Sequence, residues 1–131
     1  MFRPARSRRR RAPSAVKPTW SEDDFQVASK IRLDRWLGGS GVVYFHVPNG
    51  GFRDWNTAKN MKSSGVRKGV ADWLLFPRDG RKFALELKTA TGSQRDDQER
   101  FQRAWEATGG VYEIARSLDE VDSFILRHGI A

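Results

Sequence analysis

The spacing of apolar positions along this 131-residue chain changes several times, and each change predicts an element of secondary structure. Short runs rich in β-branched and aromatic residues, bounded by glycine or proline, predict strands. Apolar positions that recur every three or four residues behind a Ser or Thr cap predict helices. The predicted strands are Gly41–Val47, Val70–Phe76, Arg81–Thr89 and Val111–Ala115. The predicted helices run from Thr19 or Ser21 to Leu37, from Asp54 to Ser64, from a Ser93 cap to Gly109 and from a Ser117 cap to about Gly129.

The order of these elements predicts the fold class. With the short second helix set aside, the order α-β-β-β-α-β-α indicates an α/β sandwich around a mixed sheet. The turn Pro77–Gly80 makes the second and third strands an antiparallel pair. The start of the second strand is therefore expected to lie beside the end of the third.

Three polar residues in these two strands predict a catalytic site. Side chains alternate along a strand, so Glu86 and Lys88 project on one face, and Asp72 approaches Glu86 across the hairpin. Two converging carboxylates form a hard oxygen site that suits Mg²⁺ or Mn²⁺. Lys88 can orient a water molecule or stabilise charge on a phosphate. The alternative is a solvated strand face, but Asp72 and Glu86 lie within apolar runs, VADWLLF and FALELK, where charges need partners.

Two helices carry polar residues on faces that are expected to point inward. Glu22 and Gln26 share an arc with Leu33 on the first helix, and Gln98 interrupts the apolar stripe that includes Phe101. Each has a structural alternative. The helix dipole favours an acidic residue at a helix N-terminus, and a buried amide is often satisfied by backbone groups.

The net charge of +8 is concentrated near the N-terminus. Seven of the 24 basic residues and no acidic residue fall in residues 1–19, which leaves 17 basic against 16 acidic residues in 20–131. We therefore expect a disordered basic tail over 1–19 and one folded domain over 20–131. The chain has no cysteine, so disulfides do not stabilise that domain.

Basic residues at two places are expected to contact nucleic acid through its phosphates. They are Arg8, Arg9, Arg10 and Arg11 in the tail, and Arg53, Lys62, Arg67 and Lys68 before the second strand. The alternatives are a solubilising leader for the first group and a solvated helix face for the second.

Several short motifs follow one another along the folded part. They are Glu22-x-x-x-Gln26, His46-Val47-Pro48-Asn49-Gly50-Gly51, Gly65-Val66-Arg67-Lys68-Gly69-Val70-Ala71-Asp72, Glu86-Leu87-Lys88, Gly92 and Gln98. Together they resemble the VRR-NUC nucleases, a branch of the PD-(D/E)xK superfamily, over roughly residues 20–121. The resemblance implies a restriction-endonuclease-like core. One departure is Ala71, which stands where the family often has proline.

The resemblance also implies how the metal would be held. Asp72 and Glu86 would bind it together with the backbone carbonyl of Leu87. Glu22 would complete the acidic cluster, either directly or through water. Lys88 would serve the attacking water.

Further roles and the activity follow from the same resemblance. Gln98 would orient the site near the lysine, and His46 and Asn49 would face the substrate or support the site. For His46, a packed strand histidine is the alternative. The implied activity is an endonuclease that uses Mg²⁺ or Mn²⁺ on DNA, preferably branched DNA such as a Holliday junction, flap or fork. The alternatives are a nucleic-acid-binding module without catalysis and an RNA nuclease of the same fold.

Assembly and location are the last expectations. Resolving a four-way junction requires two cuts and one small domain offers one site, so a two-fold homodimer is expected. Val27 and Ile31 form an apolar strip away from the arc of Glu22, which either a second copy or the chain itself covers. No apolar run approaches membrane-spanning length and none follows the arginines, so we expect a cytoplasmic protein without a membrane segment.

Overall fold

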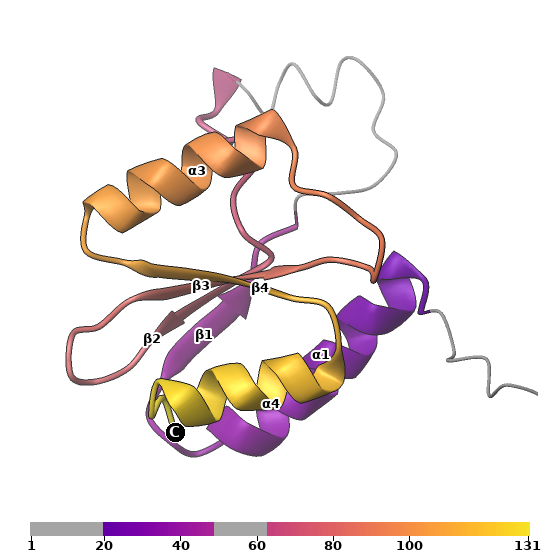
Figure 1. Cartoon of the computed structure of the whole chain (residues 1–131). Helices are drawn as coiled ribbons and strands as arrows, with labels where there is room; N and C mark the ends of the chain where they lie inside the picture. The colour runs from indigo at the N-terminus through magenta and orange to yellow at the C-terminus, as the bar shows by residue number, and fades with distance from the viewer. Residues whose placement is uncertain (1–19, 49–62) are drawn as a thin grey trace, which may run out of the picture.

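The computed structural model describes residues 20–48 and 63–131, and there the predicted order of elements is confirmed (Figure 1). The elements are α1 (Glu22–Leu37), β1 (Val43–His46), β2 (Trp73–Phe76), β3 (Phe83–Leu87), α3 (Asp96–Ala107), β4 (Val111–Ala115) and α4 (Leu118–Arg127). The helix predicted over residues 54–64 falls almost entirely outside the described ranges, and so does the predicted tail over 1–19. None of the described helices is long and apolar enough to cross a membrane.

The four strands form one mixed sheet in the order β1-β2-β3-β4, so the predicted fold class is confirmed. β1 pairs with β2 and β2 with β3 in antiparallel orientation, whereas β3 and β4 run parallel. Helix α3 connects the parallel strands and covers one face of the sheet, while α1 and α4 cover the other (Figure 1). β3 is therefore an interior strand that is buried on both faces.

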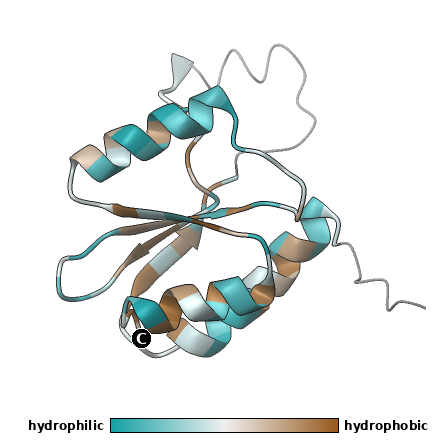
Figure 2. Cartoon of the chain, viewed as in Figure 1, coloured by the Kyte–Doolittle hydropathy of each residue, from teal (hydrophilic) through white to brown (hydrophobic). Residues whose placement is uncertain are grey.

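Apolar side chains form two clusters, one on each side of the sheet. Figure 2 shows in brown where hydrophobic residues lie along the helices and strands. The larger cluster joins α1 and α4 to the sheet and includes Leu33 and Leu85. The smaller cluster lies under α3 and includes Ala84 and Phe101. Since neighbouring side chains on a strand point to opposite faces, this division puts Glu86 on the side of the sheet that α3 covers.

Serine residues cap two of the helices, as predicted. Ser21 Oγ accepts a hydrogen bond from Asp24 N at 3.2 Å, at the start of α1. Ser117 Oγ accepts one from Glu120 N at 3.2 Å, at the start of α4. Each bond satisfies a backbone N–H group that the first turn of a helix leaves without a partner.

The start of α3 corrects the prediction of a Ser93 cap, because the helix begins at Asp96 and Arg95 is its N-cap residue. The physical reason is a bond from the side chain of Gln98, whose Oε1 accepts a hydrogen from Arg95 N at 2.9 Å. This bond holds Arg95 in an extended conformation, with φ −84° and ψ 163°. The helix therefore starts later and Gln98 lies in its first turn.

The strand β2 also starts later than predicted, at Trp73 instead of Val70. Gly69 has a φ of +80°, and a β-carbon at this position would lie 2.4 Å from the carbonyl oxygen of Asp97. Glycine permits both this conformation and this close approach. The segment that leads into Asp72 consequently packs against the start of α3.

Candidate active site

A cavity of about 300 Å³ lies where the start of β2 and the end of β3 meet the first turns of α1 and α3. Its lining residues are Glu22, Asp23, Phe25, Gln26, His46, Pro48, Asp72, Glu86, Leu87, Lys88, Arg95 and Gln98. All five residues that the sequence predicts to be catalytic are in this set, together with Leu87 and His46. The fold thus brings the predicted residues to one place.

The register of the hairpin puts Asp72 beside Glu86. Trp73 pairs with Leu85 in the antiparallel ladder. Asp72, which precedes Trp73, therefore lies next to Glu86, which follows Leu85. Asp72 Oδ2 also accepts a hydrogen bond from Leu87 N at 2.7 Å. That bond fixes the Asp72 carboxylate against the end of β3.

β1 holds the backbone of Asp72 from the other side. The carbonyl oxygen of Asp72 lies 2.7 Å from Val47 N and 2.8 Å from His46 Nδ1. A carbonyl oxygen only accepts hydrogen bonds, so Nδ1 of His46 is the donor in its contact with Asp72. The ring of His46 also packs 5.5 Å from that of Trp73. His46 therefore supports the Asp72 backbone while it lines the cavity.

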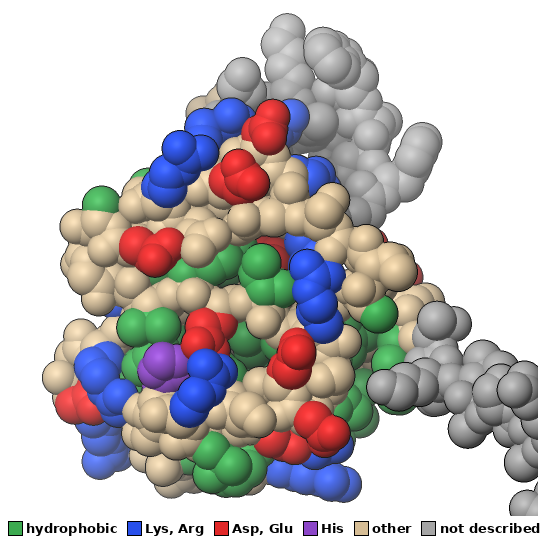
Figure 3. Space-filling view, in the orientation of Figure 1, with side chains coloured by type: hydrophobic (Ala, Val, Ile, Leu, Met, Phe, Trp, Pro, Cys, Tyr) green, Lys and Arg blue, Asp and Glu red, His purple; other side chains and the backbone are tan. Residues whose placement is uncertain are grey.

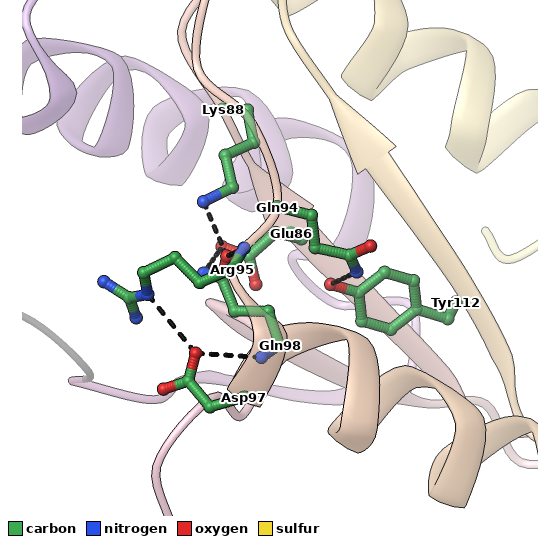
Figure 4. A network of polar contacts seen from close by, with 7 residues as sticks. All are labelled: Glu86, Lys88, Gln94, Arg95, Asp97, Gln98 and Tyr112. Atoms are coloured by element: carbon green, nitrogen blue, oxygen red, sulfur yellow. Dashed lines mark hydrogen bonds and ion pairs between the residues drawn. The ribbon is translucent and has the colours of Figure 1, made fainter.

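Gln98 connects the lysine to the acidic pair. Its Oε1 accepts hydrogen bonds from Lys88 Nζ at 2.7 Å and from Arg95 N at 2.9 Å. Its Nε2 donates to Glu86 Oε1 at 3.1 Å. Figure 4 shows the side chains of Lys88, Gln98 and Glu86 gathered around these bonds. The amide thus fixes the positions of two predicted site residues, in addition to its bond to the backbone.

The carboxyl group of Glu86 is held where its charge is costly. The residue is only 3% exposed, and its Oε2 is buried without a hydrogen-bond partner among the described residues. Burial, and next the negative charge of Asp72, raise the pKa of Glu86 to about 9, although Lys88 and Arg95 oppose this shift. Strong perturbation in a cleft is a feature of functional groups, and added positive charge would relieve it.

These donors fit a divalent metal ion with oxygen ligands. Asp72 and Glu86 supply carboxylates, Leu87 lines the same cavity, and Oε2 of Glu86 has no hydrogen-bond partner among the described residues. Within residues 20–48 and 63–131, no three His, Cys, Asp or Glu side chains are grouped closely enough to hold a metal. Glu22 lines the cavity without forming such a group. Two carboxylates are nevertheless enough for Mg²⁺, which usually keeps several waters.

The residues predicted to contact nucleic acid are only partly described. Arg67 and Lys68 are exposed on the segment that leads to Asp72, and the guanidinium of Arg67 lies 5.6 Å from the ring centre of Phe101. The others fall outside the described ranges: Asn49, Arg53, Lys62, Arg8, Arg9, Arg10 and Arg11.

Other residues around the site were not predicted from the sequence. Arg116 donates hydrogen bonds to the carbonyls of Thr89 (2.8 Å) and Gly92 (2.5 Å), in the segment that follows Lys88. No motif marks this role, since Arg116 simply follows a strand. Arg95 lines the cavity, and its only sequence signal is an unusual cation at the start of a helix.

Tyr112 forms a further part of the surroundings that the sequence did not indicate. Its hydroxyl accepts a hydrogen bond from Gln94 Nε2 at 3.1 Å (Figure 4). Burial, and then the nearby charge of Glu86, raise the pKa of Tyr112. The phenol therefore stays neutral beside the acidic pair. Its position follows from the parallel pairing of β3 and β4, which a sequence pattern alone does not specify.

Comparisons with known proteins agree with this architecture. No family model and no curated protein matches the sequence. One solved structure, a "VRR_NUC domain protein", is similar with a TM-score of 0.67 and 19% identity over 85% of this chain and 89% of its own. A second, a "VRR_NUC domain", has a TM-score of 0.55 and 15% identity over 79% of this chain and 95% of its own. The chain therefore has the fold of a VRR-NUC domain, as its motifs had implied.

Proposed function

We propose that this chain is an endonuclease that hydrolyses DNA phosphodiesters with the help of Mg²⁺ or Mn²⁺. The observation that carries the proposal is the convergence of Asp72, Glu86 and Lys88 on one cavity, where Glu86 Oε2 lacks a partner among the described residues. The fold that the chain shares with VRR-NUC domains supports it. A divalent ion, when bound, would offset charge on the phosphate and activate water.

The chain's own residues would each contribute a distinct effect. Asp72 and Glu86 would hold the ion, and Lys88 would donate a hydrogen bond to the water or to a phosphate oxygen as charge develops. Gln98 fixes the ammonium group of Lys88 through the 2.7 Å bond, so less reorganisation is needed during reaction. In the reaction a water oxygen bonds to phosphorus and the bond from phosphorus to a bridging oxygen breaks.

Substitutions of the acidic pair and the lysine test this function. Asp72→Asn should remove cleavage of plasmid DNA and keep DNA binding, because it leaves unchanged the basic residues that are proposed to bind phosphates. Lys88→Ala should lower turnover about a hundredfold or more without lowering Mn²⁺ affinity. Asp119→Asn, an exposed position on α4, is the matched control and should behave as wild type.

Metal binding has a readout that does not depend on activity. Mn²⁺ should raise the thermal unfolding midpoint of the wild type and of Asp119→Asn. The rise should be much smaller for Asp72→Asn. Near-wild-type cutting by Asp72→Asn at saturating metal would reject the assignment. Binding of DNA without cleavage by the wild type would instead favour a non-catalytic module.

The structure of the substrate is a second part of the proposal. We infer a preference for branched DNA from the resemblance of the motifs to VRR-NUC nucleases. A panel of flap, fork, four-way junction, linear duplex and single-stranded RNA substrates, cut with Mg²⁺ or Mn²⁺, tests it. Faster cleavage of RNA than of any DNA would favour the RNA nuclease of the same fold.

We also propose that the chain forms a two-fold homodimer through α1. Val27 and Ile31 are 60% and 53% exposed, so no described part of the chain covers the apolar strip that they form. Val27 also lines an open groove of about 530 Å³ beside the cavity. A second copy would bury this strip and provide the second active site that resolving a junction needs.

Light scattering at micromolar concentration measures this assembly. We expect a mass of twice 15.0 kDa for the wild type. Ile31→Glu should give a folded monomer, because it puts a charge in the interface. Arg103→Glu on α3, on the other side of the sheet, is the control and should not change the mass. A wild-type monomer both alone and with junction DNA would reject the dimer.

A further inference from the structure

Arg95 is a cation at the mouth of the cavity for which the proposed mechanism has no use. Its backbone is fixed by the bond from Arg95 N to Gln98 Oε1, the same oxygen that binds Lys88. Its side chain is 61% exposed, and its Nε lies 3.3 Å from Asp97 Oδ1. No described residue accepts a hydrogen bond from its two terminal nitrogens, so these remain available to a ligand.

Stability does not account for an arginine at this position. Preferred N-cap residues are Ser, Thr, Asp and Asn, and a positive charge at a helix N-terminus opposes the helix dipole. The pair with Asp97 is exposed and stretched, and such pairs contribute little. The energetics of the helix start therefore favour other residues at position 95.

The two cations beside the acidic pair differ in what they can reach. Lys88 is 7% exposed and is bonded to Gln98, so it can act only on a group that enters the cavity. Arg95 lies close enough to Glu86 to oppose the rise in its pKa, yet its guanidinium is at the surface. Figure 4 shows Arg95 on the same side of the network as the ammonium group of Lys88.

We propose that Arg95 binds a backbone phosphate of the nucleic acid next to the phosphate that is hydrolysed. The inference rests on the proposed nuclease function and adds a substrate-binding residue to it. The planar guanidinium presents paired N–H donors that match two phosphate oxygens. On the face seen in Figure 3, acidic and basic side chains are interspersed.

Steady-state cleavage and equilibrium binding test the assignment on one fork substrate. For Arg95→Gln we expect KM to rise about tenfold, which corresponds to the loss of one charge-assisted hydrogen bond. The value of kcat should stay unchanged. Binding without divalent metal should lose about 0.9 from the slope of log affinity against log salt. Arg95→Lys should keep that slope and recover part of the affinity, because lysine keeps the positive charge but lacks the paired N–H donors of the guanidinium.

Arg103→Gln is the matched control, since it removes the same charge from the same helix at a 76% exposed side chain outside the cavity. Equal effects of Arg95→Gln and Arg103→Gln would show a general electrostatic effect and overturn the proposal. An unchanged KM and slope in Arg95→Gln would overturn it too, and so would a loss confined to kcat. In each case the wild type still cuts DNA, whereas a wild type without nucleolytic activity refutes the proposed function itself.

Discussion

At the scale of a single side chain, the titration of Glu86 makes the stability of the metal-free protein depend on pH. Its usual pKa is 4.5, and in the folded protein burial and the charge of Asp72 raise the value to about 9. Between these two pH values the folded protein holds a proton that the unfolded chain has released. The favourable contribution of the neutral acid is therefore fully present below pH 4.5 and is lost as pH rises towards 9.

We predict that Glu86→Gln flattens this pH dependence, because glutamine has the shape of the neutral acid and does not titrate. Thermal unfolding in EDTA at several pH values from about 5 to about 9 gives the measurement. The midpoint of the wild type should fall more steeply with rising pH than that of the variant. Glu106→Gln, an exposed change on α3, should keep the wild-type slope. Parallel curves for the wild type and Glu86→Gln would contradict the prediction.

At the scale of elements, what the sequence could predict depended on local signals. The turn Pro77–Gly80 specified the hairpin, and the hairpin alone brought Asp72 beside Glu86. The start of α3 could not be predicted in the same way, because Ser93 is a good local cap. The bond from Gln98 Oε1 to the backbone N of Arg95 overrides that signal.

The pattern of residues likewise could not predict which side chains are exposed or which distant segments contact each other. The spacing of Val27 and Ile31 showed an apolar strip on α1, but not whether other parts of the chain cover it. The close approach of Gly69 to Asp97 depends on how two distant segments pack, and its only sequence signal was a glycine before the second predicted strand. This approach links the segment before Asp72 to the helix that carries Gln98.

We predict that Gly69→Ala destabilises the protein by more than about 1 kcal/mol and lowers cleavage, because the added β-carbon meets the backbone of Asp97. Gly80→Ala provides the control. Gly80 also has a positive φ, of +87°, but a β-carbon there meets nothing within 4 Å. Chemical denaturation of both variants separates the steric effect from conformational strain. Equal loss of stability and equal activity in the two variants would show that the packing against α3 is unimportant.

On the scale of the whole molecule, the candidate site joins the two helical layers of the sandwich. α1 reaches the cavity from one face of the sheet with Glu22 and Gln26, and α3 reaches it from the other with Gln98. The sheet between them contributes Asp72 and Glu86 at the end of its interior strands. A site built in this way depends on the packing of both layers, which explains why its residues are scattered through the sequence.

The distribution of charge over the whole chain gives the last prediction. Residues 1–19 carry seven basic and no acidic residues, whereas 20–131 carry 17 basic and 16 acidic residues. Long-range attraction to DNA should therefore come mainly from residues 1–19, and the reaction itself from the cavity.

Deleting residues 1–19 should weaken DNA binding and reduce the slope of log affinity against log salt, by about 0.9 for each phosphate that these residues neutralise in the full chain. Cleavage at saturating DNA should persist, because every described residue that lines the cavity remains. An unchanged slope would mean that residues 1–19 do not touch DNA. In that case the affinity would have to arise from cations within residues 20–131, such as Arg67 and Lys68 on the segment before Asp72 and Arg95 at the cavity.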